Sequence, residues 1–220
     1  NFKDLRYSNF GFIVVLPDFV LKHYIGKDFF ESHGMKLNSE NFFFQEKRNY
    51  EIITEKSDIL VPKFEHQKTI EIPYKIEIAK IENIRKNCEK INSFAELEPK
   101  SLLSIIRKLH TIETKWDKNF IHGNIHPTNF YVKNSEIWVF DFVSCRLDHK
   151  EIDLARILIY ADYSDKAWNE IKDCYKDNLN KKVLEYYIKE HALENYKYGK
   201  NIEMIKKMKD FLVFAFGKKW

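Results

Sequence analysis

Apolar and polar positions in the first 80 residues follow patterns that are typical of β-strands. Residues 10–16 form an apolar run with β-branched members, and after a Pro-Asp turn signal residues 19–25 continue in an alternating pattern. Residues 68–78 alternate as well, with isoleucines on one face and charged residues such as Glu77 on the other. Pro73 divides this stretch into two half-buried strands. The first part of the chain is therefore predicted to form a small sheet.

A helical periodicity occupies residues 39–56, and Ser39 is the expected N-terminal cap. Glu51 lies on the charged face of this helix, where we predict that it is solvated. Glu46 instead falls on the apolar stripe. The apolar members of this stripe are Phe43, Tyr50 and Ile53.

Lys22 interrupts an otherwise apolar strand. A carboxylate that faces inward from a helix needs a cation nearby, and Lys22 is the obvious one, so we predict an ion pair between Lys22 and Glu46. The alternative is a lysine on an edge strand that extends its ammonium group into water.

The most distinctive stretch is a polar, turn-rich loop from His122 to Asn129 that runs directly into a hairpin of residues 130–140. The second strand of this hairpin delivers Asp141 back beside the loop. An amide oxygen and a carboxylate side by side suit a magnesium ion that carries phosphates. The alternative is an ordinary hairpin, because Asn and Asp also favour turns.

The composition places the chain among soluble globular proteins, with 44% hydrophobic and 32% charged residues in a length of 220. This length can bury a full core in one bilobal unit or two small lobes. The net charge of +4 does not require a nucleic acid partner, although it would help at an anionic membrane surface or around phosphates. Three widely spaced cysteines favour reduced thiols, and we predict a cytoplasmic protein.

The loop and hairpin resemble the catalytic and metal-binding loops of the protein-kinase-like superfamily, in the form found in aminoglycoside phosphotransferases and small-molecule kinases. His122-Gly123, Asn129 and Asp141-Phe142 match that pattern in residue type and spacing. Asp153-Leu154-Ala155 resembles the next motif of the same family.

This resemblance implies an α+β, bilobal fold, with a mainly-β N-lobe over residues 1–81 and a helical C-lobe over residues 82–220. It also implies ATP and Mg²⁺ as cofactors. Lys22, held by Glu46, would contact the nucleotide phosphates, and Asn129 and Asp141 would hold the metal ion. Residues 79–84 would follow the last strand of the small lobe as the hinge that contacts adenine.

Asn124 departs from the family pattern, which has the catalytic Asp at this position. An amide can orient an acceptor hydroxyl but cannot act as a base, and loss of a general base costs about 10²–10⁴ in rate. His126, two residues further on, is the titratable candidate to replace this base, and a structural role is expected for it. Several explanations stay open: a slow kinase, a nucleotide-binding pseudokinase, an engineered inactive form, or a binding module with vestigial kinase loops.

Residues 111–121 alone separate His110 from His122, where aminoglycoside phosphotransferases carry a long substrate cap. The short connection resembles that of lipopolysaccharide-core sugar kinases, and the loop 126–130 resembles the heptose-kinase branch. We therefore expect a sugar or glycolipid hydroxyl as acceptor, such as lipopolysaccharide-core heptose. The aromatic and basic residues 211–220 indicate either a docked helix or a peripheral contact at the inner membrane face.

Overall fold

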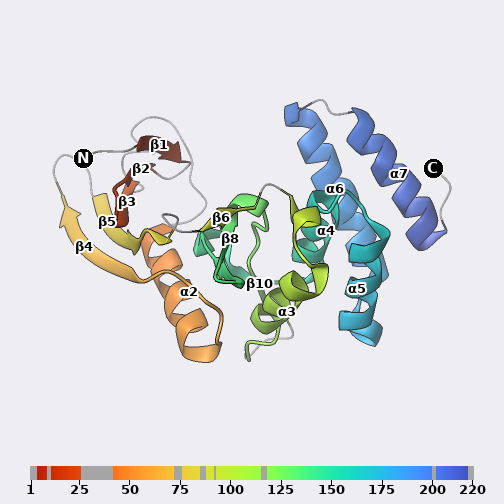
Figure 1. Cartoon of the computed structure of the whole chain (residues 1–220), viewed down its shortest axis with the longest axis horizontal. Helices are drawn as coiled ribbons and strands as arrows, with labels where there is room; N and C mark the ends of the chain where they lie inside the picture. The colour runs from red at the N-terminus through yellow and green to blue at the C-terminus, as the bar shows by residue number, and fades with distance from the viewer. Residues whose placement is uncertain are drawn as a thin grey trace. The chain divides into compact units, whose positions relative to one another are not determined.

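The structure is a computed structural model that describes residues 4–8, 11–25, 42–71, 76–84, 88–91, 93–114, 118–199 and 202–217 (Figure 1). Contacts divide the chain into two compact units, each described here by itself. The first unit contains Asn1–Lys90 and Tyr131–Val143, and the second contains Ile91–Phe130 and Ser144–Trp220. The first unit thus includes a hairpin from outside the predicted N-lobe segment. The second unit is mostly helical, so the α+β class is confirmed.

The first unit is built on a five-stranded antiparallel sheet in the order β1-β2-β3-β5-β4. Its strands are β1 (Asp4–Ser8), β2 (Gly11–Val15), β3 (Phe19–Ile25), β4 (Phe64–Ile70) and β5 (Ile76–Glu82). The predicted strands are confirmed, although Phe10 and Pro73 lie outside the described residues. Strand β3 is central, because β2 and β5 pair with its two sides.

Strand β5 corrects two expectations. It continues through Glu82, so residues 79–82 belong to the strand and do not follow it as a hinge. The buried face of β5 is also opposite to the predicted one. Glu77 is buried and shares its face with Ala79 and Ile81. Glu77 is stabilised there by partners on the paired strand: Thr69 donates to it at 2.7 Å, and the His66 Nε2 atom lies 3.0 Å away.

Helix α2 (Phe42–Lys56) supplies the other layer of the first unit's core. The predicted stripe is confirmed: Glu46 is buried among the apolar members of the stripe, while Glu51 is exposed. Phe43 packs with Tyr24 of β3 and Ala79 of β5. Ser39, the expected cap, lies outside the described residues.

The predicted hairpin is confirmed as β8 (Phe130–Lys133) and β9 (Glu136–Val139), and β6 (Glu89–Lys90) pairs with β8. Its two turn residues, Asn134 and Ser135, have φ of 52° and 66°. Positive φ at both central residues is the signature of a type I′ turn, whose twist matches that of the strands it connects. A short 3₁₀ segment, η3 (Pro127–Asn129), precedes β8.

The second unit contains α3 (Pro99–His110), α4 (Glu151–Tyr160), α5 (Asp165–Tyr175), α6 (Lys181–Gly199) and α7 (Ile202–Phe216), with β7 (Asn119–Ile121) paired to β10 (Arg146–Asp148). Helix α4 is buried along most of its length and packs against α5 and α6.

The docked form of the C-terminal helix is confirmed over its described part, because Phe211 of α7 is buried and its ring contacts Trp168. Lys218–Trp220 lie outside the described residues. None of the described helices is long and apolar enough to cross a membrane.

Candidate active site

The first unit places Lys22 at the centre of a charged cluster. The Lys22 ammonium lies 2.9 and 2.8 Å from the two carboxylate oxygens of Glu46 and 2.8 Å from Asp141 Oδ1. The predicted ion pair between Lys22 and Glu46 is therefore confirmed. The edge-strand alternative is wrong, because β3 is a central strand and Lys22 is only 6% exposed.

One ammonium is shared by two carboxylates in this cluster. Burial disfavours the charged form of Lys22, but Glu46 and Asp141 outweigh it and raise the pKa of Lys22 to about 12. Burial also raises the pKa of Glu46, opposed by Lys22 and reinforced by Asp141. The two carboxylates thus place negative charge on both sides of the Lys22 ammonium, which keeps it protonated.

Two neighbouring residues complete this cluster. The Tyr24 hydroxyl donates to Glu46 Oε2 at 2.5 Å, and burial followed by the charge of Glu46 raises the Tyr24 pKa well above its ordinary value. On the other side, Asn49 Nδ2 donates to the backbone carbonyl of Phe142 at 2.7 Å. Helix α2 therefore holds the backbone of the Asp141-Phe142 segment, and Lys22 of β3 holds the Asp141 side chain. Asp141 itself has φ of 62°, and its side chain is 30% exposed.

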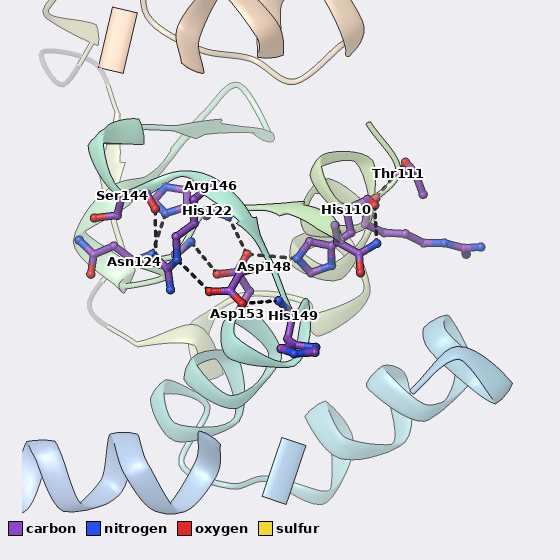
Figure 2. Close-up of polar contacts among 12 residues, drawn as sticks. His110, Thr111, His122, Asn124, Ser144, Arg146, Asp148, His149 and Asp153 are labelled. Carbon is purple, nitrogen blue, oxygen red and sulfur yellow. Dashed lines mark hydrogen bonds and ion pairs between the residues drawn. The ribbon is translucent and has the colours of Figure 1, made fainter. Parts of the chain in front are cut away.

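In the second unit, the loop that contains Asn124 is held by the buried carboxylate of Asp153 (Figure 2). Asp153 accepts hydrogen bonds from the backbone N–H of His122 at 2.8 Å and of Gly123 at 2.9 Å. It also lies 3.1 Å from Nε2 of His110. Burial alone would raise the pKa of Asp153, but these hydrogen bonds and the nearby histidines outweigh it and lower that pKa.

Gly123 is required by the path of this loop. Its φ is 75°, and a Cβ atom there would lie 2.4 Å from the carbonyl oxygen of Ser144. Any side chain would therefore push apart two backbone segments that carry the loop. Figure 2 shows Ser144 and Arg146 beside Asn124, and Arg146 donates to the Ser144 carbonyl at 3.3 Å.

The two predicted magnesium ligands lie in different units, and each has the donor chemistry that Mg²⁺ needs. Asn129 is buried, and its Nδ2 atom donates to the carbonyl of Asn124 at 3.0 Å, which leaves the amide oxygen as the donor atom for a cation. Asp141 presents a partly exposed carboxylate beside Lys22. Both residues fit an oxygen-ligated ion. Over the described ranges, no group of three or more His, Cys, Asp and Glu side chains could hold a metal ion.

His126 has the structural role expected for it. Its Nδ1 atom accepts from the backbone N–H of Thr128 at 3.2 Å and so caps η3. Burial and then the charge of Arg156 lower the His126 pKa, which favours the neutral ring. With Nδ1 occupied as an acceptor, the other nitrogen carries the proton, so this histidine is a poor replacement for a base at Asn124.

Comparison with family models and with curated proteins finds no match for this sequence. Solved structures do match. The choline kinase LicA from Streptococcus pneumoniae is similar with a TM-score of 0.62 and 12% identity, over 98% of this chain and 94% of that one. APH(2″)-IIa in a ternary complex with streptomycin and ATP is similar with a TM-score of 0.61 and 11% identity, over 94% of this chain and 91% of that one. A thermostable mutant of the aminoglycoside phosphotransferase APH(4)-Ia, in a complex with ADP and hygromycin B, is similar with a TM-score of 0.57 and 8% identity. The match covers 99% of this chain and 96% of that one.

The chain has the protein-kinase-like fold. Within this kinase-like chain, four residues that support the site were missed by sequence reasoning. Tyr24 lies two residues after Lys22 on the same strand face, and Asn49 lies three residues after Glu46 on the same helix stripe, so local periodicity could have identified both. His110 and Tyr175, whose side chains lie 2.7 Å apart beside Asp153, come from separate helices and give no local signal.

Proposed function

We propose that the protein is an ATP-dependent phosphotransferase that acts on a hydroxyl group. The observation that carries this proposal is the buried cluster in which Lys22 contacts both Glu46 and Asp141. A buried lysine held by a helix carboxylate is suited to contact nucleotide phosphates, because its ammonium group is fixed before the nucleotide binds. The solved structures with similar folds include complexes with ATP and ADP, which agrees with nucleotide binding.

Asp141 and Asn129 are the proposed ligands of Mg²⁺, which when bound would neutralise charge on the nucleotide phosphates. In this chain, Lys22 holds the Asp141 carboxylate in place, and Asn49 holds the adjoining backbone. Asn129 is oriented by the carbonyl of Asn124. Asn124 is the proposed contact of the acceptor hydroxyl, which its amide can orient. Hydrogen bonds from the flanking His122 and Gly123 to Asp153 fix the loop around it.

The acceptor that we propose is a cell-envelope sugar, such as the heptose of a lipopolysaccharide core. The short connection between His110 and His122 supports this choice, because it leaves no room in sequence for a long substrate cap. The described part of that connection contains strand β7, which pairs with β10. A short connection suits an acceptor presented by a larger molecule.

The experiment that tests nucleotide binding is calorimetry with ATP and Mg²⁺ on the wild-type protein and on Asp141→Ala. We expect the wild type to bind and Asp141→Ala to lose the part of the affinity that depends on magnesium. Asp148→Ala is the matched control, since Asp148 is also a partly exposed aspartate that contacts a basic side chain. Equal affinity in the wild type and Asp141→Ala would remove the basis for the metal site.

Asn124 supports a second candidate, a pseudokinase that binds nucleotide and regulates a partner without transfer. Comparing transfer from ATP by the wild type and by Asn124→Asp separates the two functions. If the chain is a slow kinase, Asn124→Asp should raise the rate by about 10²–10⁴, the usual contribution of a general base. Acceptors to offer in parallel are lipopolysaccharide core, aminoglycosides and generic proteins. Nucleotide binding without transfer by either form would favour the pseudokinase.

A further inference from the structure

Arg156 of α4 is a partly buried cation with too few partners. Its side chain is 20% exposed, and its ion pair with Glu194 is long, at 3.8 Å. Its Nε atom is buried without a hydrogen-bond partner among the residues that the structure describes. A buried N–H group without a partner is destabilising, so this guanidinium gains from any oxyanion that it can reach.

His191 of α6 lies beside the same carboxylate and shows the same deficit. Its Nδ1 atom is 3.5 Å from Glu194 Oε2, the oxygen that Arg156 also approaches, and its Nε2 atom is buried without a partner in the described part of the chain. Burial and then the charge of Arg156 lower the His191 pKa, in spite of Glu194. Glu194 is 54% exposed, so it compensates the charge of Arg156 only weakly.

The face of α4 that carries Arg156 runs along the loop that contains Asn124. At one end, Asp153 binds the backbone of His122 and Gly123. At the other end, the ring of Tyr160 contacts the ring of His126 with centroids 4.6 Å apart. Positions 153, 156 and 160 share one helix face, and 153 and 160 are separated by about 10 Å along the axis. Arg156 lies between these two contacts, so its charge also reaches His126.

We propose that Arg156 and His191 bind an anionic group, a phosphate or a carboxylate, carried by the hydroxyl acceptor. Arginine presents paired N–H donors that match an oxyanion, and its Nε and Nη atoms can bind one group in a bidentate manner. To do so, the guanidinium turns from its long contact with Glu194 toward the ligand. When the anion binds, His191 takes up a proton on Nε2 and so adds a second donor from the neighbouring helix, because its Nδ1 atom faces the Glu194 carboxylate. This inference rests on the proposed phosphotransferase function, since it assigns the chemistry of the acceptor.

The site therefore differs in charge from one that would suit choline or an aminoglycoside, both of which are cations. A cationic acceptor would lie beside the positive charge of Arg156, which repels it, and not beside carboxylates that would attract it. Glu194 is the acidic side chain that pairs with both Arg156 and His191, and most of it is exposed to solvent. Repulsion by a partly buried guanidinium is stronger than at an exposed position, because water screens it less.

The test uses three sugars of similar size and different charge: glucose 6-phosphate, glucose and glucosamine. Calorimetry on the full chain without nucleotide should show the order glucose 6-phosphate, then glucose, then glucosamine. Arg156→Gln should weaken glucose 6-phosphate binding at least about tenfold, which is 1.4 kcal/mol. Arg156→Lys should keep part of it. Arg107→Gln is the matched control, because Arg107 is an exposed arginine of the same unit on helix α3, and it should bind like the wild type.

Two further measurements make the result decisive. Thermal unfolding of Arg156→Gln shows that the variant is folded, and the side-chain NMR signals of His191 should move when glucose 6-phosphate is added to the wild type. The proposal is overturned if Arg156→Gln binds as well as the wild type, or if glucosamine binds most tightly. It is also overturned if neither glucose 6-phosphate nor inorganic phosphate binds at all.

Failure of this proposal is distinguishable from failure of the proposed function. The sugar titration needs neither ATP nor Mg²⁺. If magnesium-dependent ATP binding is absent but Arg156-dependent anion binding is present, the anion site stands and the phosphotransferase function falls. If ATP binds and the charged sugar does not, the phosphotransferase function stands and the acceptor requires other chemistry.

Discussion

The two units each hold an aspartate at the centre of a hydrogen-bonded cluster, and the clusters differ in how the negative charge is compensated. Asp153 in the second unit is completely buried, and its oxygens receive two backbone N–H groups and face His110. Asp141 in the first unit is 30% exposed and shares Lys22 with Glu46. Asp153 is thus enclosed by hydrogen-bond donors of its own unit, whereas Asp141 presents part of its carboxylate to solvent.

This difference separates positioning from ligand binding. A saturated, buried carboxylate fixes a loop, because each of its hydrogen bonds constrains a backbone atom. A carboxylate that is partly exposed can accept a further cation without first losing its own partners. The opposite pKa directions of Asp153, which is lowered, and Glu46, which is raised, express the same contrast. Three experiments test this contrast between the two clusters.

The largest effect is expected for Asp153→Asn, which should lower the free energy of unfolding by about 3 kcal/mol or more. Hydrogen bonds to a charged group contribute about 1.5–3 kcal/mol each, and this change weakens those from His122, Gly123 and His110 together. Urea unfolding measures the effect. Asp148→Asn is the control, because Asp148 is 22% exposed and its pair with Arg146 lies near the surface, so a change within about 1 kcal/mol is expected. Equal losses in both variants would mean that Asp153 is not the organising residue of the loop.

An intermediate effect is expected in the pH dependence of stability, where the two clusters should show opposite slopes. The pKa of Asp153 lies below its ordinary value of 3.8, so its contribution is complete above pH 3.8 and is lost as the pH falls through the lowered pKa. The pKa of Glu46 lies above its ordinary value of 4.5, so the native state takes up this proton before the unfolded state does. As the pH falls toward 4.5, the wild type should therefore gain stability relative to Glu46→Gln.

Urea unfolding of the wild type, Asp153→Asn and Glu46→Gln over this pH range checks both directions. The advantage of the wild type over Asp153→Asn should hold down to pH 3.8 and shrink below it. If both variants change in the same direction relative to the wild type, the two carboxylates are compensated alike and the comparison fails.

Local periodicity was sufficient to predict the pair at the centre of the first cluster. Lys22 stands in an alternating strand and Glu46 on a helix stripe, and each is buried by the pattern in which it lies. The hairpin that delivers Asp141 was predictable for the same reason, since its two strands and polar turn are adjacent in sequence. The proximity of Asp141 to Lys22, 119 positions apart, is a tertiary contact that no local pattern contains.

The second cluster was less predictable, because it depends on contacts between separate helices. His110, Asp153 and Tyr175 come from α3, α4 and α5, and a histidine at the end of an apolar helix carries no sign of its partner. Glu77 illustrates the same limit in the sheet. Its burial depends on Thr69 and His66 across the β4–β5 pair, so the strand register decides which face is buried.

The smallest effect is expected for Tyr24→Phe, which removes the hydroxyl that donates to Glu46 but keeps the ring contact with Phe43. Glu46 retains the Lys22 ammonium on both of its oxygens, so the free energy of unfolding should fall by only about 1 kcal/mol. Tyr175→Phe is the matched change in the second unit, because its hydroxyl lies 2.7 Å from Nδ1 of His110. Losing that partner leaves a buried imidazole nitrogen unsatisfied, so Tyr175→Phe should cost more than Tyr24→Phe in urea unfolding.

Magnesium-dependent ATP affinity should respond in the opposite order, since Tyr24 contacts the Lys22 cluster directly whereas Tyr175 belongs to the other unit. A larger loss of ATP affinity in Tyr175→Phe would show that the cluster around Asp153, and not the cluster around Lys22, governs nucleotide binding.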